Sequence, residues 1–229
     1  ASAARAQARI AAEAQRQAEL ETVRATAEKQ KAERTSRFMQ SFLEYANPHW
    51  YGRGKGRMNV TVREAIDDAA ARIDTELADE PEVRADLHYT VGEVYRTHSE
   101  RENARKHFRQ SLDLYRQVHG EQHPKVARGL YYLSLFETDI EAGESLLRQG
   151  IAIMRQTDPG NVNLPYMLQS LAGWIISGEK QTGNESRLTE AESLILESKP
   201  LFVRHYGEDH VATLTVGTQM AMLASTRGD

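Results

Sequence analysis

Apolar residues recur at helical spacing along most of the chain, and no stretch of convincing length alternates in the manner of a strand. Residues 1–46 predict one long helix, because Ala, Glu, Gln, Arg and Lys dominate and Pro48 is the first Gly or Pro. Large aliphatic side chains are sparse in its first thirty residues, which favours a solvated extension over a coiled coil. Docking onto a core is expected to begin at Phe38, Met39, Phe42 and Leu43.

A second segment, residues 47–81, is expected to hold a connection and a capping helix. Residues 47–60 are basic and Gly-rich, but no Gly-Lys-Ser/Thr follows them and no strand precedes them, so a phosphate-binding loop is not indicated. Thr61 and Glu64 form a capping box that opens a helix ending before Pro81. One face of this helix carries Val62, Ile66, Ala69, Ala70, Ile73 and Leu77.

From residue 82 the pattern predicts paired helices. The turn Gly120–His123 recurs as Gly207–His210, at a distance of about two repeats of some forty residues each. The predicted fold class is therefore all-α, a helical-hairpin solenoid over residues 82–229 preceded by a long N-terminal helix. The predicted helices are Val83–Arg96 with Asn103–His119, Val126–Thr138 with Ala142–Gln156, Pro165–Ser177 with Leu188–Tyr206, and Val211–Ser225.

Each predicted first helix contains an apolar–small pair, and each second helix places a small residue three positions after a large one. These pairs resemble the tetratricopeptide repeat, in its longer variant with a Gly-x-x-His-Pro turn between units. Small residues let antiparallel helices approach closely, while large ones fill the gap to the next unit. The first-helix pairs are Val91-Gly92, Leu133-Ser134, Leu171-Ala172 and Met220-Ala221, and the second-helix pairs are Phe108 with Ser111, Leu147 with Gly150, and Ile195 with Ser198.

The first 80 residues, with the entry into the repeats, carry a second resemblance, to the region behind the transmembrane helix of bacterial serine/threonine protein kinases. In that family the repeats form the extracytoplasmic part. The resemblance implies a membrane anchor upstream of residue 1. The repeat register separately predicts a fourth unit that is cut after its first helix, so the chain is expected to be a piece of a longer protein. No kinase signature is present, so no phosphoryl transfer is assigned to this chain. The residues that match are Phe42, Leu43, Ala46, Asn47 and Pro48, Val60 to Glu64, and Pro81 to Ala85.

Composition narrows the classes of function. Hydrophobic residues make up 40% of the chain and charged residues 27%, as in a chain that folds. The net charge of −4 gives no electrostatic case for binding nucleic acid. The chain contains no Cys, which excludes disulfides, thiolate nucleophiles and thiolate zinc sites. It also contains no apolar run of about 18 residues that would span a bilayer.

No pattern of residues predicts catalysis, a cofactor or a metal site. His119 and His123 flank a turn instead of sharing a helical face. The same turn recurs at His205 and His210, which favours a structural corner between units. The His-Glu-x-x-His and Gly-x-Ser-x-Gly motifs are absent.

Repeat solenoids bind ligands along a concave groove that is formed mainly by the first helix of each unit. Exposed aromatic and Arg side chains there are typical of peptide recognition, although tyrosines can equally fill gaps between helices. Both interpretations stay open at this point. The Lys and Asn clamp for a C-terminal carboxylate is absent. By register, the residues expected to face inward are Asp86, Tyr89, Glu93 and Arg96, then Arg128, Tyr131 and Leu135, then Tyr166, Gln169 and Gly173.

The favoured hypothesis is a non-catalytic module that binds a protein or peptide. It would be the sensor or scaffold region of a membrane-anchored bacterial serine/threonine kinase, on the extracytoplasmic (periplasmic) face of the inner membrane. The alternative is a soluble cytoplasmic adaptor that uses the same groove, with a homodimer formed through residues 1–46. An enzyme with attached repeats is a third class, for which no site is predicted.

Overall fold

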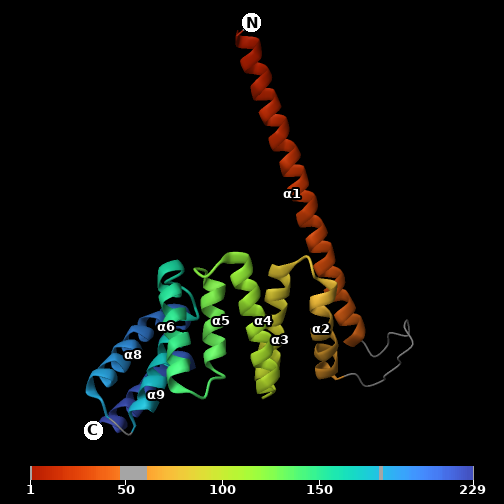
Figure 1. The fold of residues 1–229 in the computed structure, drawn as a ribbon. Coiled ribbons are helices and arrows are strands. Elements are labelled where there is room, and N and C mark those ends of the chain that lie inside the picture. Colours follow the sequence, from red (N-terminus) through yellow and green to blue (C-terminus); the bar gives the residue numbers. More distant parts are fainter. Residues whose placement is uncertain (1, 47–60, 181–182, 229) are drawn as a thin grey trace. The chain divides into compact units, whose positions relative to one another are not determined.

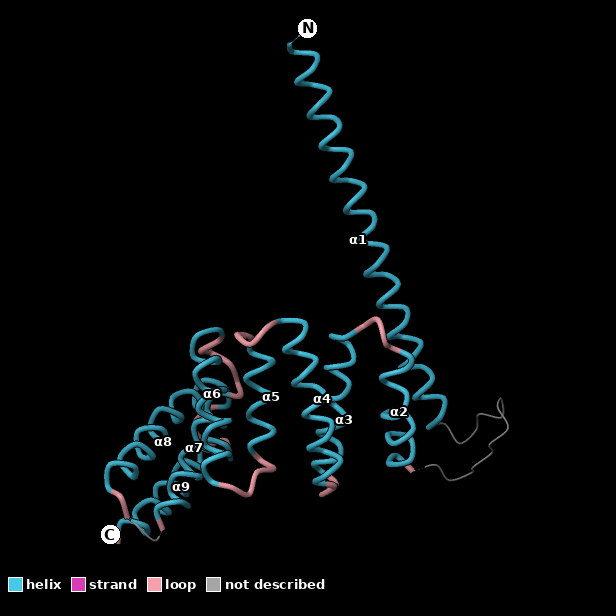
Figure 2. Tube along the Cα trace, in the orientation of Figure 1, coloured by secondary structure: helices cyan, strands magenta, loops and turns pink. Residues whose placement is uncertain are grey.

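The computed structural model describes residues 2–46, 61–180 and 183–228, and within these ranges the chain forms nine helices and no strand. Figure 2 shows short loops between consecutive helices from residue 61 to residue 180. The predicted all-α fold class is therefore confirmed, while the Gly-rich connection predicted at residues 47–60 lies outside the described residues. The helices are α1 (Ser2–Ala46), α2 (Val62–Glu76), α3 (Pro81–Thr97), α4 (Arg101–His119), α5 (Pro124–Ser134), α6 (Ile140–Thr157), α7 (Leu164–Glu179), α8 (Glu185–Tyr206) and α9 (Val211–Arg227).

Contacts divide the chain into two compact units, residues 1–84 and 85–229. In the first unit, side chains of α1 from Gln15 to Gln30 are all exposed, as predicted for a solvated extension. Packing begins near Phe38, which is buried and lies under the Arg72 guanidinium of α2 at 5.5 Å from the ring centroid. The side chains of Met39, Phe42 and Leu43, which were expected to continue this contact, lie outside the described part of the chain.

The capping box predicted for α2 is present. The Thr61 hydroxyl accepts from the Glu64 backbone amide at 3.2 Å, and the Glu64 carboxylate accepts from the Thr61 amide at 3.1 Å. Two amides at the helix start therefore gain partners that the helix itself does not provide. Of the face predicted for α2, Ile66, Ala69, Ile73 and Leu77 are buried and Ala70 is half-buried, so the predicted amphipathic helix is confirmed where the side chains are described.

In the second unit, α3 to α8 form three helical hairpins and α9 follows as a single helix (Figure 1). The helices of a hairpin approach closely where a small residue faces a large one. A Cβ atom added at Gly92 of α3 would lie 3.0 Å from the Phe108 ring of α4. The Ser111 hydroxyl of α4 donates to the Ala85 carbonyl of α3 at 2.8 Å. The close approach predicted from the apolar–small pairs is thus confirmed.

Charged residues join the second helices of neighbouring hairpins. Arg148 of α6 pairs with Glu190 of α8, and Arg155 pairs with Glu197 at 2.6 Å. Arg187 of α8 pairs with the buried Glu144 and, at 2.6 Å, with Glu179. Burying a carboxylate without a partner is costly, so these ion pairs also offset the burial of Glu144 and Glu179.

The two Gly-x-x-His turns are structural corners, as the sequence predicts. Gly120 and Gly207 both have positive φ, 76° and 88°, which favours glycine. His123 and His210 each cap the next helix, because the Nδ1 atoms accept from the amides of Lys125 and Ala212 at 3.2 and 3.1 Å. In the first corner the ring of His119 stacks on the capping imidazole, with centroids 4.0 Å apart. In the second corner the ring of Tyr206 does so, with centroids 4.6 Å apart.

Helix α5 ends earlier than the periodicity suggests. The sequence predicts a helix to Thr138, but α5 ends at Ser134 and Leu135 is its cap. The amides of Leu135, Phe136 and Glu137 donate to carbonyls three residues back, so the chain tightens and then turns. The apolar pattern runs on because Phe136 is buried outside the helix.

Candidate binding face

The side chains predicted to face inward lie on the first helices of the three hairpins, and we call this set the A-helix face. It belongs entirely to the second unit of the chain. The α3 members are Asp86, Tyr89, Glu93 and Arg96, the α5 members are Arg128, Tyr131 and Leu135, and the α7 members are Tyr166 and Gln169. Their exposure ranges from open (Asp86, Arg96) to buried (Gln169).

Arg128 occupies the centre of the part formed by α3 and α5. Its guanidinium carbon lies 3.9 Å from the centroid of the Tyr89 ring and 5.9 Å from that of Tyr115. The Nη2 atom donates to the Tyr115 hydroxyl at 3.1 Å. A guanidinium that stacks on aromatic rings is attracted by their π faces and is held in one orientation.

Asp86 is linked to Arg128 by two hydrogen bonds through the Tyr115 hydroxyl. The Tyr115 hydroxyl, which accepts from Arg128, donates to Asp86 Oδ1 at 2.6 Å. Lys125 pairs with the same carboxylate at 3.1 Å and lies 5.1 Å from the centroid of Tyr115. The charge of Asp86 is therefore matched by Lys125, and that of Arg128 is not.

A cluster of tyrosines continues the face beside Arg128. Tyr132 contacts Tyr89 edge-on, with centroids 5.2 Å apart, and Tyr131 lies 5.0 Å from Tyr132. Glu93 and Arg96 form an ion pair at 2.8 Å within α3. These residues of α3 and α5 therefore make one continuous aromatic and charged surface. Leu135, at the cap of α5, is half-buried.

The two α7 residues do not join that cluster. Tyr166 contacts Phe202 and Tyr206 of α8, at centroid distances of 4.8 and 6.3 Å. Gln169 is buried, because Thr215 of α9 donates to its Oε1 atom and Gln219 donates to its backbone carbonyl, both at 3.0 Å. In the third hairpin the side chains predicted to face inward thus mainly pack against their neighbours.

Three members of the cluster were not among the residues predicted to face inward. Tyr132 follows Tyr131 on α5. Tyr115 comes from the second helix of the first hairpin, and Lys125 from the first turn of α5. Tyr115 lies before the Gly120–His123 corner and Lys125 lies just after it. Their nearness to that turn is the sequence signal that could have identified these two residues. Two other aromatic residues of the first helices serve packing: Tyr95 is buried and stacks on His107, and the half-buried Trp174 covers Gly143.

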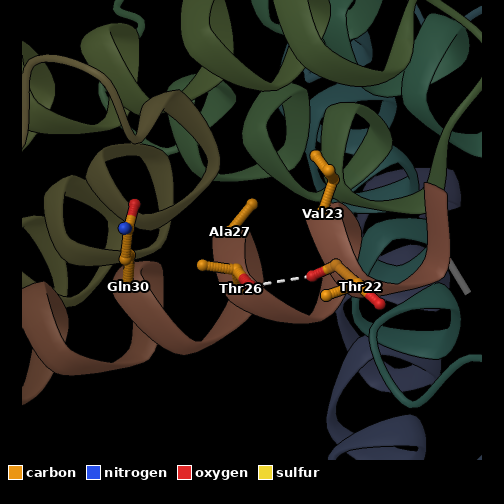
Figure 3. Close-up of a pocket in the computed structure, with 5 residues that line it drawn as sticks. All are labelled: Thr22, Val23, Thr26, Ala27 and Gln30. Carbon is orange, nitrogen blue, oxygen red and sulfur yellow. Dashed lines mark hydrogen bonds between the residues drawn. The ribbon is translucent and has the colours of Figure 1, made fainter. Parts of the chain in front are cut away.

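Two shallow surface hollows in the described residues lie away from this face, on α1 and α4. One is a shallow strip of α1, lined by Thr22, Val23, Thr26, Ala27 and Gln30 (Figure 3). The Thr26 hydroxyl there donates to the Thr22 carbonyl at 2.8 Å, so it serves the helix. Within the described ranges, no three His, Asp or Glu residues are grouped to hold a metal ion. In the same ranges, no helix combines the length and apolar character needed to cross a membrane.

Burial of the tyrosines gives a first testable prediction. Burial, with the hydrogen bond to Tyr206, raises the pKa of Tyr166 to about 12. Burial also raises the pKa of Tyr115, Tyr131 and Tyr132. The folded state holds these protons more tightly than the unfolded state, so stability should fall as the pH rises above about 10.

The measurement is absorbance at 295 nm during an alkaline titration of the native chain and of the chain in urea. Part of the nine tyrosines should ionise late in the native chain and near pH 10 in urea. The Tyr132→Phe variant should lose one late step. A single native transition near pH 10 would contradict the prediction.

Comparisons with known proteins agree with the repeat architecture. A family profile described as "Tetratricopeptide repeat" matches residues 90–125, which span most of the first hairpin and its following corner. No characterised protein sequence gives a match. Solved structures of similar fold share too little sequence identity with this chain to carry a function over to it.

The crystal structure of BtubC (BKLC) from P. vanneervenii has a TM-score of 0.59 at 12% identity, over 73% of this chain and 65% of that one. A putative kinesin light chain of Podosopora anserina, with nearly identical TPR-like repeats, gives 0.51 at 13% identity. Its Q17M variant gives 0.53 at 13% identity. Both of these cover 85% of this chain and 88% of theirs. The chain therefore contains a tetratricopeptide-repeat region with an all-α helical-repeat fold.

Proposed function

We propose that this chain is a non-catalytic module that binds a protein or peptide segment on the A-helix face, and that the segment carries a carboxylate for Arg128. The tetratricopeptide-repeat architecture supports the general class, since helical repeats present extended binding surfaces. The cluster around Arg128 supports the class of ligand. Peptide ligands of this kind are anchored by aromatic and Arg side chains.

The single observation that carries the proposal is the unmatched charge of Arg128. It is stacked on Tyr89 and hydrogen-bonded to Tyr115, and among the described residues no carboxylate pairs with it. Lys125 and Arg96, the other cations of the face, already have Asp86 and Glu93. A preoriented guanidinium loses little freedom when it accepts a carboxylate, so a bidentate pair is favoured there.

Selection from a displayed library of random peptides tests this. The full chain should enrich peptides that contain Asp or Glu, and Arg128→Met should reduce the affinity of a selected peptide by about tenfold or more. Arg109→Met, the same change at an exposed position of α4, should leave the affinity unchanged. Equal affinity for wild type and Arg128→Met would overturn the role of Arg128, and failure to enrich any peptide would overturn the binding function.

The proposal places this module in the extracytoplasmic part of a membrane-anchored bacterial serine/threonine kinase, as its sensor or scaffold. Its support is the resemblance of the first 80 residues, with the entry into the repeats, to that region of such kinases. The gene sequence directly upstream decides it: a membrane span preceded by kinase motifs is expected, and a start codon at that point contradicts it in favour of a soluble adaptor.

The proposal also includes pairing of α1 between two copies. Among the described side chains of this helix, the large aliphatics Leu20 and Val23 are exposed, at 58% and 66% of their full accessibility. Light scattering on the chain with both residues changed to Glu tests the pairing, which should weaken. Unchanged association would assign the contact to another surface.

A further inference from the structure

The corner between the first two hairpins contains an imidazole that caps a helix only in its neutral form. His123 precedes α5, and its Nδ1 atom accepts a hydrogen bond from the Lys125 amide at 3.2 Å. A protonated imidazole carries hydrogen on both ring nitrogens and can only donate, so this bond requires neutral His123. A free imidazole takes up its proton at about pH 6.5. In mild acid the proton therefore competes with the Lys125 amide for the same nitrogen.

The place of His123 in the corner disfavours a positive charge on its ring. The ring lies at the start of α5, where the helix dipole is positive. It stacks on His119 of α4 with centroids 4.0 Å apart and planes inclined by 10°. The ammonium group of Lys125 belongs to the first turn of the same helix. A proton on His123 thus adds a positive charge to a turn that already carries one.

Acidic groups near this corner are engaged in ion pairs. Glu121 of the turn pairs with Arg116 of α4 at 3.1 Å, and Asp86 of α3 pairs with Lys125 at the same distance. Further titratable or charged groups on the elements packed against α5 are Tyr115 and His119 of α4, and Arg155 and Asp158 of α6, which bond to Glu197 and Asn161.

The capped turn carries part of the cluster around Arg128. The Lys125 amide donates to His123, and the Lys125 ammonium holds Asp86 at 3.1 Å. Arg128 follows three residues later and bonds to the Tyr115 hydroxyl, which donates to the same carboxylate. The first amides of a helix have no partner within it, so loss of the cap favours fraying of this turn. Fraying loosens Lys125 and with it the orientation of Arg128.

We propose that His123 is a positioning residue that makes ligand binding at Arg128 depend on pH. Near neutral pH its imidazole caps α5 and holds the cluster in place, whereas in mild acid protonation removes the cap and binding weakens. The capped state holds fewer protons than the uncapped one, so affinity rises with pH in this range. Asp and Glu side chains ionise at about pH 4, so the carboxylate of the ligand keeps its charge throughout. This regulation rests on the proposed function.

Asparagine separates the effect of the proton from that of the cap. Its side chain is favourable at this position and does not titrate, so His123→Asn should keep α5 capped at every pH. His123→Ala removes the cap at every pH. The second corner provides the matched control His210→Asn, because the His210 Nδ1 atom accepts from the Ala212 amide at 3.1 Å and caps α9. The cluster around Arg128 comes from α3, α4 and α5.

Isothermal titration calorimetry of the full chain tests the proposal with an acidic peptide that is selected from the random library and contains no His. Wild-type affinity should fall about fivefold from pH 7.5 to pH 5.5, which is the worth of one helix cap. His123→Asn should bind equally at both pH values. His123→Ala should bind at pH 7.5 as weakly as the wild type does at pH 5.5. His210→Asn should keep the wild-type fall, and circular dichroism should show all variants folded.

A second readout needs no ligand. The amide proton resonance of Lys125 should move to higher field in the wild type over the same pH range, because its hydrogen bond is lost, and should stay in place in His123→Asn. A resonance that does not move, or that moves alike in both chains, overturns the inference. Equal wild-type affinity at both pH values, or the same fall in His123→Asn, also overturns it. If no peptide is enriched, the proposed function and its regulation fail together, while a resonance that moves still assigns the titrating cap to His123.

Discussion

Replacing Phe108 by Ala is expected to lower the free energy of unfolding by about 3–5 kcal/mol. The ring, on α4, is fully buried and contacts residues of α3 and α5. It lies against Gly92, stacks on Tyr132 at 4.8 Å and contacts Tyr89 and Phe136, both at 5.8 Å. Truncation would leave a cavity that Gly92, with no side chain, cannot help to fill.

Denaturant unfolding followed by circular dichroism measures this change. The control is Val118→Ala, on the same helix but at an exposed position, where a change of less than about 1 kcal/mol is expected. Because Phe108 supports Tyr132 and Tyr89, the variant should also lower the pKa of Tyr132 towards its ordinary value. A loss of stability no larger than that of Val118→Ala would show that the first hairpin does not depend on this ring.

Much of the fold was predictable because helix caps, turns and close helix contacts each require particular residue types at particular positions. The capping box at Thr61 needs two side chains at a fixed spacing, and the corners at Gly120 and Gly207 need a residue that accepts positive φ. The early end of α5 was not predictable from periodicity. It depends on Phe136, which is buried after the helix has ended and so continues the apolar pattern.

The candidate site was predictable in part. Register places a residue on the inner side of its helix, and Tyr89 and Arg128 do meet there. Whether such a side chain is also exposed depends on how the first helix of the following unit packs against it. The position of the residue in its own helix does not determine that packing. Gln169 shows this, since Thr215 and Gln219 of α9 cover it from about one repeat away. Tyr115 was missed for another reason: it reaches the face from a second helix, and register was considered only along the first helices.

Replacing Gly150 by Val is expected to lower the free energy of unfolding by about 3 kcal/mol, by forcing α6 away from α5. An added Cβ atom would lie 2.7 Å from the Met167 methyl and 3.0 Å from the Ala127 carbonyl oxygen. The methyl group ends a flexible side chain and can move. The carbonyl oxygen is bound into α5 and moves only if that helix shifts, which would also disturb Arg128 one residue further on.

Gly217→Val provides the matched control, because it makes the same change in the middle of another helix where nothing lies within 4 Å. Valine and glycine differ by less than about 0.5 kcal/mol in helix propensity, so this variant should unfold almost as the wild type does. Thermal unfolding of both, at a concentration too low for association, separates packing from propensity. If the two variants unfold alike, the small residue in α6 is not what sets the spacing of the hairpin. If Gly150→Val alone is unstable and Gly150→Ala lies between, the distance between α5 and α6 is set by the absence of a side chain at this position.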